Sequence, residues 1–304
     1  MKLKTSYLSL VFVAFIATNL LNAQNDLSCL SSIPAVPISE LQDTNLQSLL
    51  EQEIKANPVW KNLVRTKKMS IGIVDLSDEN DIKYAGINDE DMMYAASLPK
   101  IAVLLAAMDA IDKGELKDTK TVRQDMRLMI SKSNNQATTR MIDRVGYKKI
   151  EAVLREPKHK LYDEEVGGGL WVGKRYAASG ARYPDPMKGL SHAATTKQVC
   201  SFYYQLAIGN LVNTKRSKEM LKIMKNPDLH HKFVNTLDII APNADVYRKS
   251  GSWKNYHSDS ALVWGPDRKY IIVALVDNSN GEQIIRNLVK PLDRVLKKSR
   301  ILIK

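Results

Sequence analysis

The sequence has few cysteines, few histidines and no long apolar run beyond its first residues, and each shortage excludes a class of protein. Only Cys29 and Cys200 occur among 304 residues, which excludes a disulfide framework, although one disulfide between these two remains open. The five histidines show no zinc-binding spacing, and we expect no metal and no cofactor. No internal repeat or low-complexity tract is present, and the length suffices for one large domain or two lobes.

Acidic residues are also fewer than basic ones. The 33 Asp and Glu residues are outnumbered by 45 Lys and Arg, which gives a formal net charge of +12. A chain of this charge favours anionic surfaces such as envelope polymers or lipid head groups. We expect no nucleic-acid partner, because there is no recognition helix, zinc finger or aromatic-basic stacking motif.

The first 23 residues have the pattern of a secretory signal peptide. Lys2 and Lys4 precede an apolar stretch over residues 8–21, and Leu21-Asn22-Ala23 offers a cleavage site. The stretch is too short and too interrupted for a convincing membrane span, so we expect no transmembrane segment in the mature chain; an uncleaved N-terminal anchor is the alternative. We expect an exported protein, periplasmic or extracellular, and no lipoprotein anchor at Cys29.

Hydrophobic patterning divides the rest of the chain into a tether over residues 24–43 and a folded domain over residues 44–304. A helix is predicted over 44–55 and a strand hairpin over 69–87. Further helices are predicted at about 97–113, 122–132, 133–145, 148–155, 194–208 and 214–225, around a loop-rich segment over 156–192. Strands return over 246–253, 260–264 and 270–276, followed by an amphipathic helix over 283–297.

Strands near both chain ends and helices between them predict an α+β fold. An antiparallel sheet built from both ends would form an α/β lobe from residues 44–96 and 238–304. Residues 97–237 would form an inserted helical lobe. We expect a cleft where the two lobes meet, and a monomer.

Ser97-Leu98-Pro99-Lys100 introduces the first helix of the helical lobe. Pro99 suits a first helical turn, so Ser97 is predicted at or just before the helix N-terminus, with Lys100 one turn above it. A hydroxyl there meets the positive end of the helix dipole, and a desolvated lysine can remove its proton. Taken alone, the pair is also consistent with a helix cap and a surface lysine.

Two further motifs occur later in the chain. Ser133-Asn134-Asn135 precedes a predicted helix, and Lys249-Ser250-Gly251-Ser252 lies in the strand that begins the C-terminal sheet. Taken singly, the first is consistent with a helix cap and the second with an edge-strand lysine beside a bulge glycine. The three motifs together resemble those of the penicillin-recognising serine enzymes, and the chain most resembles the class A β-lactamases over most of residues 44–304.

The resemblance implies the serine β-lactamase and DD-peptidase fold and a role for each motif residue. Ser97 would be the nucleophile and Lys100 the group that activates it. Ser133 would pass a proton to the leaving nitrogen, and Asn135 would bind the acylamide carbonyl of the substrate.

The third motif supplies the remaining roles that the resemblance implies. Lys249 would sustain a positive field, and Ser250 would help to bind the substrate carboxylate. Gly251 would let the strand approach closely. The backbone N–H of Ser252 would join that of Ser97 in an oxyanion hole.

The sequence departs from the class A pattern in three places. Asn134 stands where the family usually has aspartate, and only 36 positions separate Ser97 from Ser133, which implies a smaller helical lobe and a more open cleft. The Glu-x-x-x-Asn motif of the family's Ω-shaped loop is absent. Its glutamate activates the water that releases the acyl group, and only three acidic residues of the corresponding segment are candidates to replace it: Glu164, Glu165 and Asp185.

The expected function is therefore β-lactam hydrolysis through an acyl-enzyme at Ser97, with slow release of the acyl group, and hence a role in β-lactam catabolism and antibiotic resistance. The alternative within the same chemistry is a D-alanyl-D-alanine carboxypeptidase, or another envelope peptide or ester hydrolase that acts on peptidoglycan. A sensor that binds β-lactam or peptidoglycan without turnover is the alternative from another class. A basic pocket suits the acidic substrates of all three.

Overall fold

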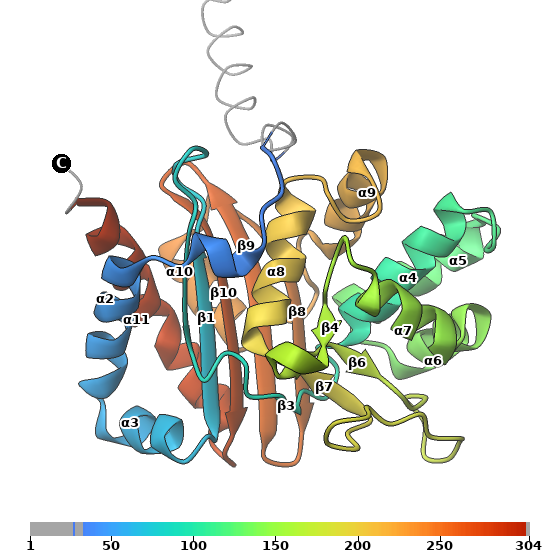
Figure 1. The fold of residues 1–304 in the computed structure, drawn as a ribbon, viewed down its shortest axis with the longest axis horizontal. Helices are drawn as coiled ribbons and strands as arrows, with labels where there is room; N and C mark the ends of the chain where they lie inside the picture. The colour runs from blue at the N-terminus through green and yellow to red at the C-terminus, as the bar shows by residue number, and fades with distance from the viewer. Residues whose placement is uncertain (1–26, 28–32, 302–304) are drawn as a thin grey trace, which may run out of the picture.

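The computed structural model describes residue 27 and residues 33–301, so Cys29 and the predicted signal peptide lie outside the described residues. Sheet and helices form the predicted α+β fold (Figure 1). The first elements are η2 (Ile38–Leu41), α2 (Thr44–Lys55), α3 (Pro58–Arg65), β1 (Met69–Asp75), β2 (Lys83–Ile87), β3 (Met93–Tyr94), α4 (Lys100–Asp112), α5 (Lys120–Ser131), α6 (Asn135–Val145) and α7 (Tyr147–Arg155). The remaining ones are β4 (Tyr162–Asp163), η3 (Glu164–Val166), β5 (Gly168–Gly169), β6 (Trp171–Val172), β7 (His192–Ala194), α8 (Thr196–Ala207), α9 (Thr214–Met224), α10 (Phe233–Ile240), β8 (Asp245–Trp253), β9 (Tyr256–Gly265), β10 (Arg268–Asp277) and α11 (Gly281–Ile301).

The main sheet joins the two ends of the domain. Its five strands have the order β2-β1-β10-β9-β8, and every neighbouring pair is antiparallel. The N-terminal hairpin β1–β2 therefore lies beside the C-terminal strand β10, with Met69 opposite Val276. The prediction of one antiparallel sheet from both termini is confirmed.

Both faces of this sheet are buried, because successive residues of its central strands point alternately into two apolar cores. In β10, Ile271 and Val273 belong to the core shared with α4 and α8, whereas Ile272 and Ala274 belong to the core shared with α2, α10 and α11. Figure 1 shows α8 on one face of the sheet and α2 and α11 on the other side. The sheet is thus fixed rigidly between helices, and strand β8 forms its edge beside the helical part of the molecule.

Helix α4 is the central helix of the helical part. All residues from Lys100 to Ile111 are buried, so the helix is enclosed on every side. It contacts α5, α6, α7 and α9, which surround it in Figure 1. A lysine at its first turn is therefore held in an apolar setting, where its amine can lose its proton near neutral pH.

Two helices were not expected from the sequence. Pro58 begins α3 instead of only ending α2, because Asn57 caps the new helix and accepts hydrogen bonds from the N–H groups of Val59 and Trp60. Helix α10 is rich in β-branched residues of weak helix propensity. It forms because Phe233 and Leu237 are buried against the sheet and α11.

The segment over 156–192 contains more regular structure than predicted. It forms four short strands, and β7 pairs with both β3 and β6 in a second, three-stranded sheet. This small sheet connects the segment to the residues immediately before Ser97, because Tyr94 pairs with Ala193.

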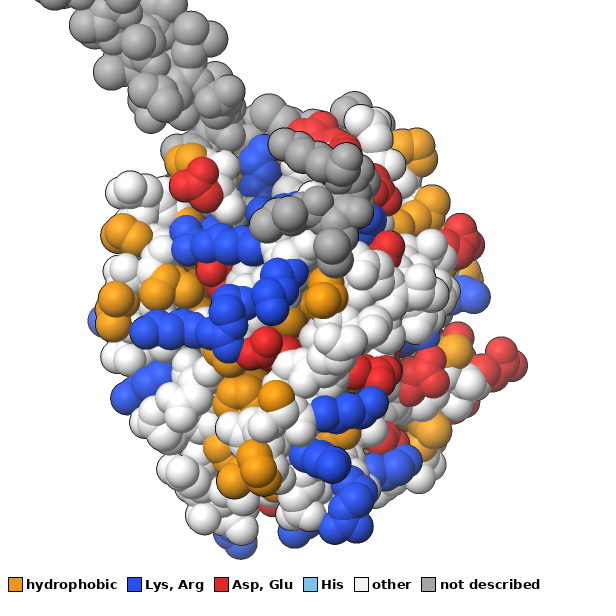
Figure 2. Space-filling model, turned by 90° about the vertical axis from the view of Figure 1, so that its left-hand side faces the viewer, with side chains coloured by type: hydrophobic (Ala, Val, Ile, Leu, Met, Phe, Trp, Pro, Cys, Tyr) orange, Lys and Arg blue, Asp and Glu red, His pale blue; other side chains and the backbone are white. Residues whose placement is uncertain are grey.

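The surface matches the basic composition. Figure 2 shows Lys and Arg side chains spread across the face that carries α2 and α11. Over residues 33–301, no helix combines the length and the apolar character needed to cross a bilayer. Cys200 is fully buried in α8, and the partner considered for it lies outside the described residues.

Candidate active site

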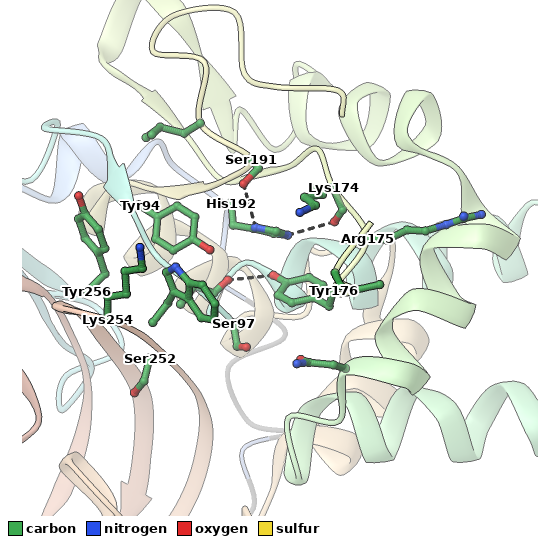
Figure 3. A pocket seen from close by; sticks show the side chains of 16 residues that line it. Tyr94, Ser97, Lys174, Arg175, Tyr176, Ser191, His192, Ser252, Lys254 and Tyr256 are labelled. Atoms are coloured by element: carbon green, nitrogen blue, oxygen red, sulfur yellow. Dashed lines mark hydrogen bonds between the residues drawn. The ribbon is translucent and has the colours of Figure 1, made fainter. Parts of the chain in front are cut away.

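Ser97 lies in the turn between strand β3 and helix α4, where it lines a cavity. Ala96 has a positive φ of 51°, which bends the backbone just before the serine. Pro99 then precedes Lys100, the first helical residue, so Ser97 lies just before the helix as predicted. In the described part of the chain the Ser97 hydroxyl makes no hydrogen bond, and Figure 3 shows it facing the cavity.

Lys100 is completely buried one turn beyond Ser97. Its Nζ donates to the carbonyl of Ser133 at 2.7 Å, to the hydroxyl of Ser133 at 3.3 Å and to Oδ1 of Asn135 at 2.8 Å. Burial lowers the pKa of Lys100 to about 7. The amine is therefore partly neutral at physiological pH and able to accept a proton.

Ser133 stands between two lysines. Its backbone has a positive φ of 54°, unusual for serine, and this conformation ends α5 and presents the hydroxyl inward. Asn134 caps α6 by accepting a hydrogen bond from the N–H of Ala137 at 2.8 Å. The asparagine that replaces the family's usual aspartate thus serves as a helix cap, and the loop keeps Ser133 and Asn135 beside Lys100.

Lys249 reaches the same hydroxyl from the sheet. Its Nζ donates to Ser133 Oγ at 2.9 Å and to the carbonyl of Ser250 at 2.6 Å. Burial, and then the positive charge of Lys100, lower the pKa of Lys249 well below its ordinary value. The Ser133 hydroxyl therefore links helix α4 to strand β8 through two buried amines.

Gly251 brings strand β8 against the turn that holds Ser97. A Cβ atom at this position would lie 2.5 Å from the backbone nitrogen of Ser97 and even closer to the carbonyl of Ala95. Only glycine allows this approach, and it leaves Ser252 lining the same cavity as Ser97. Ser250 lies 3.3 Å from Nε2 of His231, whose pKa burial lowers to about 4.

A buried polar layer supports strand β8 from behind. Arg248 forms an ion pair with Asp259 at 2.7 Å, with both side chains almost fully buried. Lys232, also buried, donates to the carbonyl of Gly251, to the hydroxyl of Ser252 and to the carbonyl of Ser258. This layer was not predicted from the sequence, because its residues adjoin the motif only after the sheet has formed.

The cavity has a volume of about 640 Å³. Its lining consists of residues 94, 96, 97, 135, 174–178, 190–192, 252–254 and 256. Lys174, Arg175 and Lys254 line it, and among the described residues no Asp or Glu does. The cavity is therefore suited to an anionic ligand and offers it no carboxylate.

The three acidic candidates for activating water lie outside the lining of the cavity. Glu164 pairs with Arg155 at 2.7 Å, and Glu165 is exposed in the turn η3. Asp185 is buried, but its carboxylate accepts hydrogen bonds from the N–H groups of residues 187, 188 and 190. None of the three lines the cavity, so the structure does not bring these carboxylates to Ser97.

Two aromatic residues of the site were missed by sequence reasoning. Tyr176 donates its hydroxyl to the carbonyl of Ala96 at 2.9 Å (Figure 3), and its ring lies 4.4 Å from Nζ of Lys100. His192 packs against this ring with centroids 4.2 Å apart and donates Nε2–H to the carbonyl of Lys174 at 3.0 Å. Burial lowers the pKa of His192 to about 4, which keeps the imidazole neutral. The sequence does not indicate either residue, because a single tyrosine or histidine in a long loop belongs to no motif of recognisable spacing.

Solved structures share this fold. The chain is similar to the β-lactamase from Sphaerobacter thermophilus, at 17% identity over 82% of this chain and 97% of that chain, with a TM-score of 0.64. It is similar to a β-lactamase from Chitinophaga pinensis, at 17% identity over 83% and 99% of the two chains, with a TM-score of 0.63. A mutant of PBP-A in an acyl-enzyme complex with penicillin G matches at 18% identity over 84% and 98%, also with a TM-score of 0.63. At these identities the likeness shows the fold alone.

Comparison with curated protein sequences finds no match. The family comparison is decisive, because residues 50–125 and 117–296 match the model of the β-lactamase enzyme family. The match includes all three motifs around the cavity and most of the chain. The protein therefore belongs to the β-lactamase enzyme family.

Proposed function

We propose that the protein is a serine hydrolase that β-lactams acylate at Ser97 and that releases the acyl group slowly, so that it acts as a weak β-lactamase. One observation carries the proposal. Two buried lysines, Lys100 and Lys249, converge on the hydroxyl of Ser133 beside a cavity that Ser97 lines and that, among the described residues, no carboxylate lines.

In the proposed acylation step, neutral Lys100 takes the proton of the Ser97 hydroxyl as Oγ attacks the carbonyl carbon of the β-lactam amide. The C–N bond then breaks, and the Ser133 hydroxyl gives its proton to the leaving nitrogen. Ser133 is in turn reprotonated through the lysines that contact it. The product is an ester between Ser97 and the opened β-lactam, with all protons accounted for.

Binding of the substrate is assigned to the remaining motif residues. The negative charge that develops on the carbonyl oxygen needs preorganised donors, and the backbone N–H groups of Ser97 and Ser252 are the proposed pair. Ser250 and the field of Lys249 would receive the substrate carboxylate, and Asn135 would bind the acylamide carbonyl. The close approach that Gly251 allows between β8 and the serine turn supports this arrangement.

We expect the acyl group to be released slowly because of which groups line the cavity. Hydrolysis of the ester needs a base that activates a water molecule. Among the described residues no carboxylate lines the cavity; Glu164 pairs with Arg155, Asp185 accepts from backbone N–H groups of its own turn, and Glu165 is exposed. Acylation can therefore proceed with the groups present, whereas deacylation lacks a dedicated base.

The same observation favours a second function, hydrolysis of D-alanyl peptides in peptidoglycan by a D-alanyl-D-alanine carboxypeptidase or related envelope hydrolase. Such an enzyme would use the same acylation residues and would retain penicillin as a persistent ester. A sensor without turnover is less well supported, since binding alone does not require a buried lysine of lowered pKa one turn from a serine. Both substrates are anionic, as the cationic cavity favours.

We also propose that the protein is exported to the periplasm or the extracellular space and acts as a monomer. The proposal on export rests on the signal-like pattern of residues 1–23. N-terminal sequencing of the protein recovered from an expressing cell tests it, with a mature chain that begins near Gln24 as the expected result.

The test of function is to mix the purified protein with a chromogenic cephalosporin and to follow colour and covalent mass together. We expect one adduct per chain and turnover that continues slowly. An adduct that persists without turnover, together with cleavage of a D-alanyl-D-alanine peptide, would favour the second function. Absence of any adduct would contradict acylation altogether.

A further inference from the structure

The side chain of Tyr176 is held at three points inside the cavity. Its hydroxyl donates to the Ala96 carbonyl at 2.9 Å, immediately before the serine. One neighbour of its ring is His192, at 4.2 Å between centroids, and another is Nζ of Lys100, at 4.4 Å from the ring centroid. Figure 3 shows the ring beside Ser97, between the serine turn and the loop that carries Lys174. A ring fixed in this way is part of the wall around the nucleophile.

The ring completes the enclosure of Lys100. A protonated lysine has three N–H donors, and the structure gives Nζ three acceptors: the carbonyl and hydroxyl of Ser133, and Oδ1 of Asn135. The tyrosine ring lies over Nζ as a fourth neighbour. This arrangement leaves no obvious position for a water molecule in contact with Nζ, in agreement with the complete burial of the side chain.

The enclosure of Lys100 affects acylation and hydrolysis of the acyl-enzyme differently. Lys100 begins helix α4 and its backbone N–H donates to the carbonyl of Ser97, so in the proposed acylation the lysine takes the serine proton directly. Hydrolysis of the acyl-enzyme instead needs a water molecule between a base and the ester carbon. Since no carboxylate among the described residues lines the cavity, Lys100, buried three residues beyond Ser97, is assigned as the base. Access of water to Lys100 then sets the rate of hydrolysis.

We propose that Tyr176 is a positioning residue that prolongs the life of the acyl-enzyme by covering Lys100 and excluding the hydrolytic water. In hydrolysis, the water oxygen attacks the ester carbon and Lys100 takes the water proton. The bond between Ser97 Oγ and the acyl carbon breaks, and Lys100 returns the proton to Oγ. Tyr176 occupies the space that this water needs. The inference rests on the proposed acylation at Ser97 and adds a residue that sets the lifetime of the resulting ester.

The test compares the lifetime of the penicillin G adduct in the purified wild-type protein and in Tyr176→Ala, by intact mass after free penicillin is removed. We expect deacylation to be about tenfold faster or more in the variant. This gain in rate is modest beside the full contribution of a general base. Tyr176→Phe keeps the ring and loses only the hydrogen bond to Ala96, so its adduct should survive about as long as the wild-type adduct. Tyr94→Ala is the matched control, because Tyr94 lines the same cavity and has no ring contact with Lys100.

Two features separate this role from a merely structural one. The faster deacylation of Tyr176→Ala should increase with pH, as expected when a neutral lysine is the base. Tyr176→Leu keeps an apolar side chain of moderate size, so its deacylation rate should lie between those of Tyr176→Ala and the wild type. It replaces Tyr176→Ala in the test if the alanine variant does not fold.

The inference is overturned if Tyr176→Ala or Tyr176→Leu forms the adduct and releases it at the wild-type rate. It is also overturned if a folded variant no longer becomes acylated, since a residue that only covers Lys100 is not needed for acylation. Failure of the wild-type protein to form any adduct would contradict the proposed function itself, so the two failures are distinguishable.

Discussion

Nζ of Lys249 lies 2.9 Å from the hydroxyl of Ser133, at the contact where strand β8 meets the helical part of the protein. Because Lys100 also donates to this hydroxyl, removal of either amine breaks a link between two motifs that are far apart in the sequence. In the proposed mechanism this hydroxyl is the route for a proton between the nucleophile and the leaving group. Each group in this arrangement can be removed separately by substitution.

Lys249→Ala should slow acylation by penicillin by about a hundredfold or more, the usual contribution of a proton-transfer group. The substitution removes the hydrogen bond to Ser133 and the buried positive charge near the substrate carboxylate. Lys254→Ala is the control, because Lys254 lines the same cavity but does not donate to the Ser133 hydroxyl, so its loss should change acylation only slightly. The second-order rate constant of adduct formation is the measurement. Equal rates for both variants would contradict the role of Lys249.

Lys100→Ala should reduce acylation by a larger factor, about a thousandfold, because it removes the proposed base one turn from Ser97. Since Lys100 is buried, thermal unfolding must show that the variant is folded before its rate is compared. A folded variant with an unchanged acylation rate would assign the base to another residue.

The acylation rate should rise with pH through a midpoint near 7. Burial lowers the pKa of Lys100 to about 7, and only the neutral amine accepts the serine proton, so the active fraction increases as pH rises through that value. Stopped-flow measurement of adduct formation between pH 5 and pH 9 tests the prediction. A rate that is flat, or that falls with rising pH over this interval, would rule out a neutral lysine as base.

Gly251→Ala should abolish most of the acylation activity. The added Cβ meets the Ser97 nitrogen and the Ala95 carbonyl, so strand β8 must move away from the serine turn; a displacement of about 1 Å can cost about a hundredfold in rate. The same clash should lower the free energy of unfolding by about 1–3 kcal/mol. Gly265→Ala is a matched control in the same sheet, because its Cβ would also meet a close neighbour, Ala244, away from the site. We expect the control to lose stability and keep acylation; comparable acylation in both variants would contradict the prediction.

His192 should make the protein less stable in acid. The unfolded imidazole binds a proton near its ordinary pKa of 6.5, whereas burial holds the pKa in the folded state at about 4. Between these values the unfolded state binds more protons, so the free energy of unfolding falls as pH falls from about 6.5 to 4. The loss due to this residue is about 3 kcal/mol. Urea unfolding at pH 7 and pH 4.5 should show a smaller difference for His192→Gln than for wild type; equal differences would contradict the assignment.

Much of the fold could be predicted because the informative signals are local. The distance of three residues between Ser97 and Lys100 places both on one helical turn wherever that helix lies. The apolar run of β10 and the hairpin β1–β2 are likewise set by patterns within a few residues. Pairing of β1 with β10 is expected from strands at both chain ends, and the structure confirms it.

The rest of the site depends on contacts between distant segments. Tyr176 and His192 reach Ser97 only because the segment over 156–192 folds back and pairs β7 with β3. Asp185 is a candidate for chemistry from its residue type and its place in the segment that corresponds to the Ω-shaped loop, yet its carboxylate is occupied by backbone N–H groups of its own turn. Lys232 has a positive φ and reaches Gly251 from a different element, a contact that no local pattern indicates.

The central claim is that Ser97 becomes covalently acylated. The most direct test incubates the wild-type protein and Ser97→Ala with penicillin G and measures the intact mass of each. The account predicts one penicilloyl group on the wild-type chain, with long persistence, and none on the variant. Equal labelling of both proteins, or an unmodified wild-type chain, would contradict it.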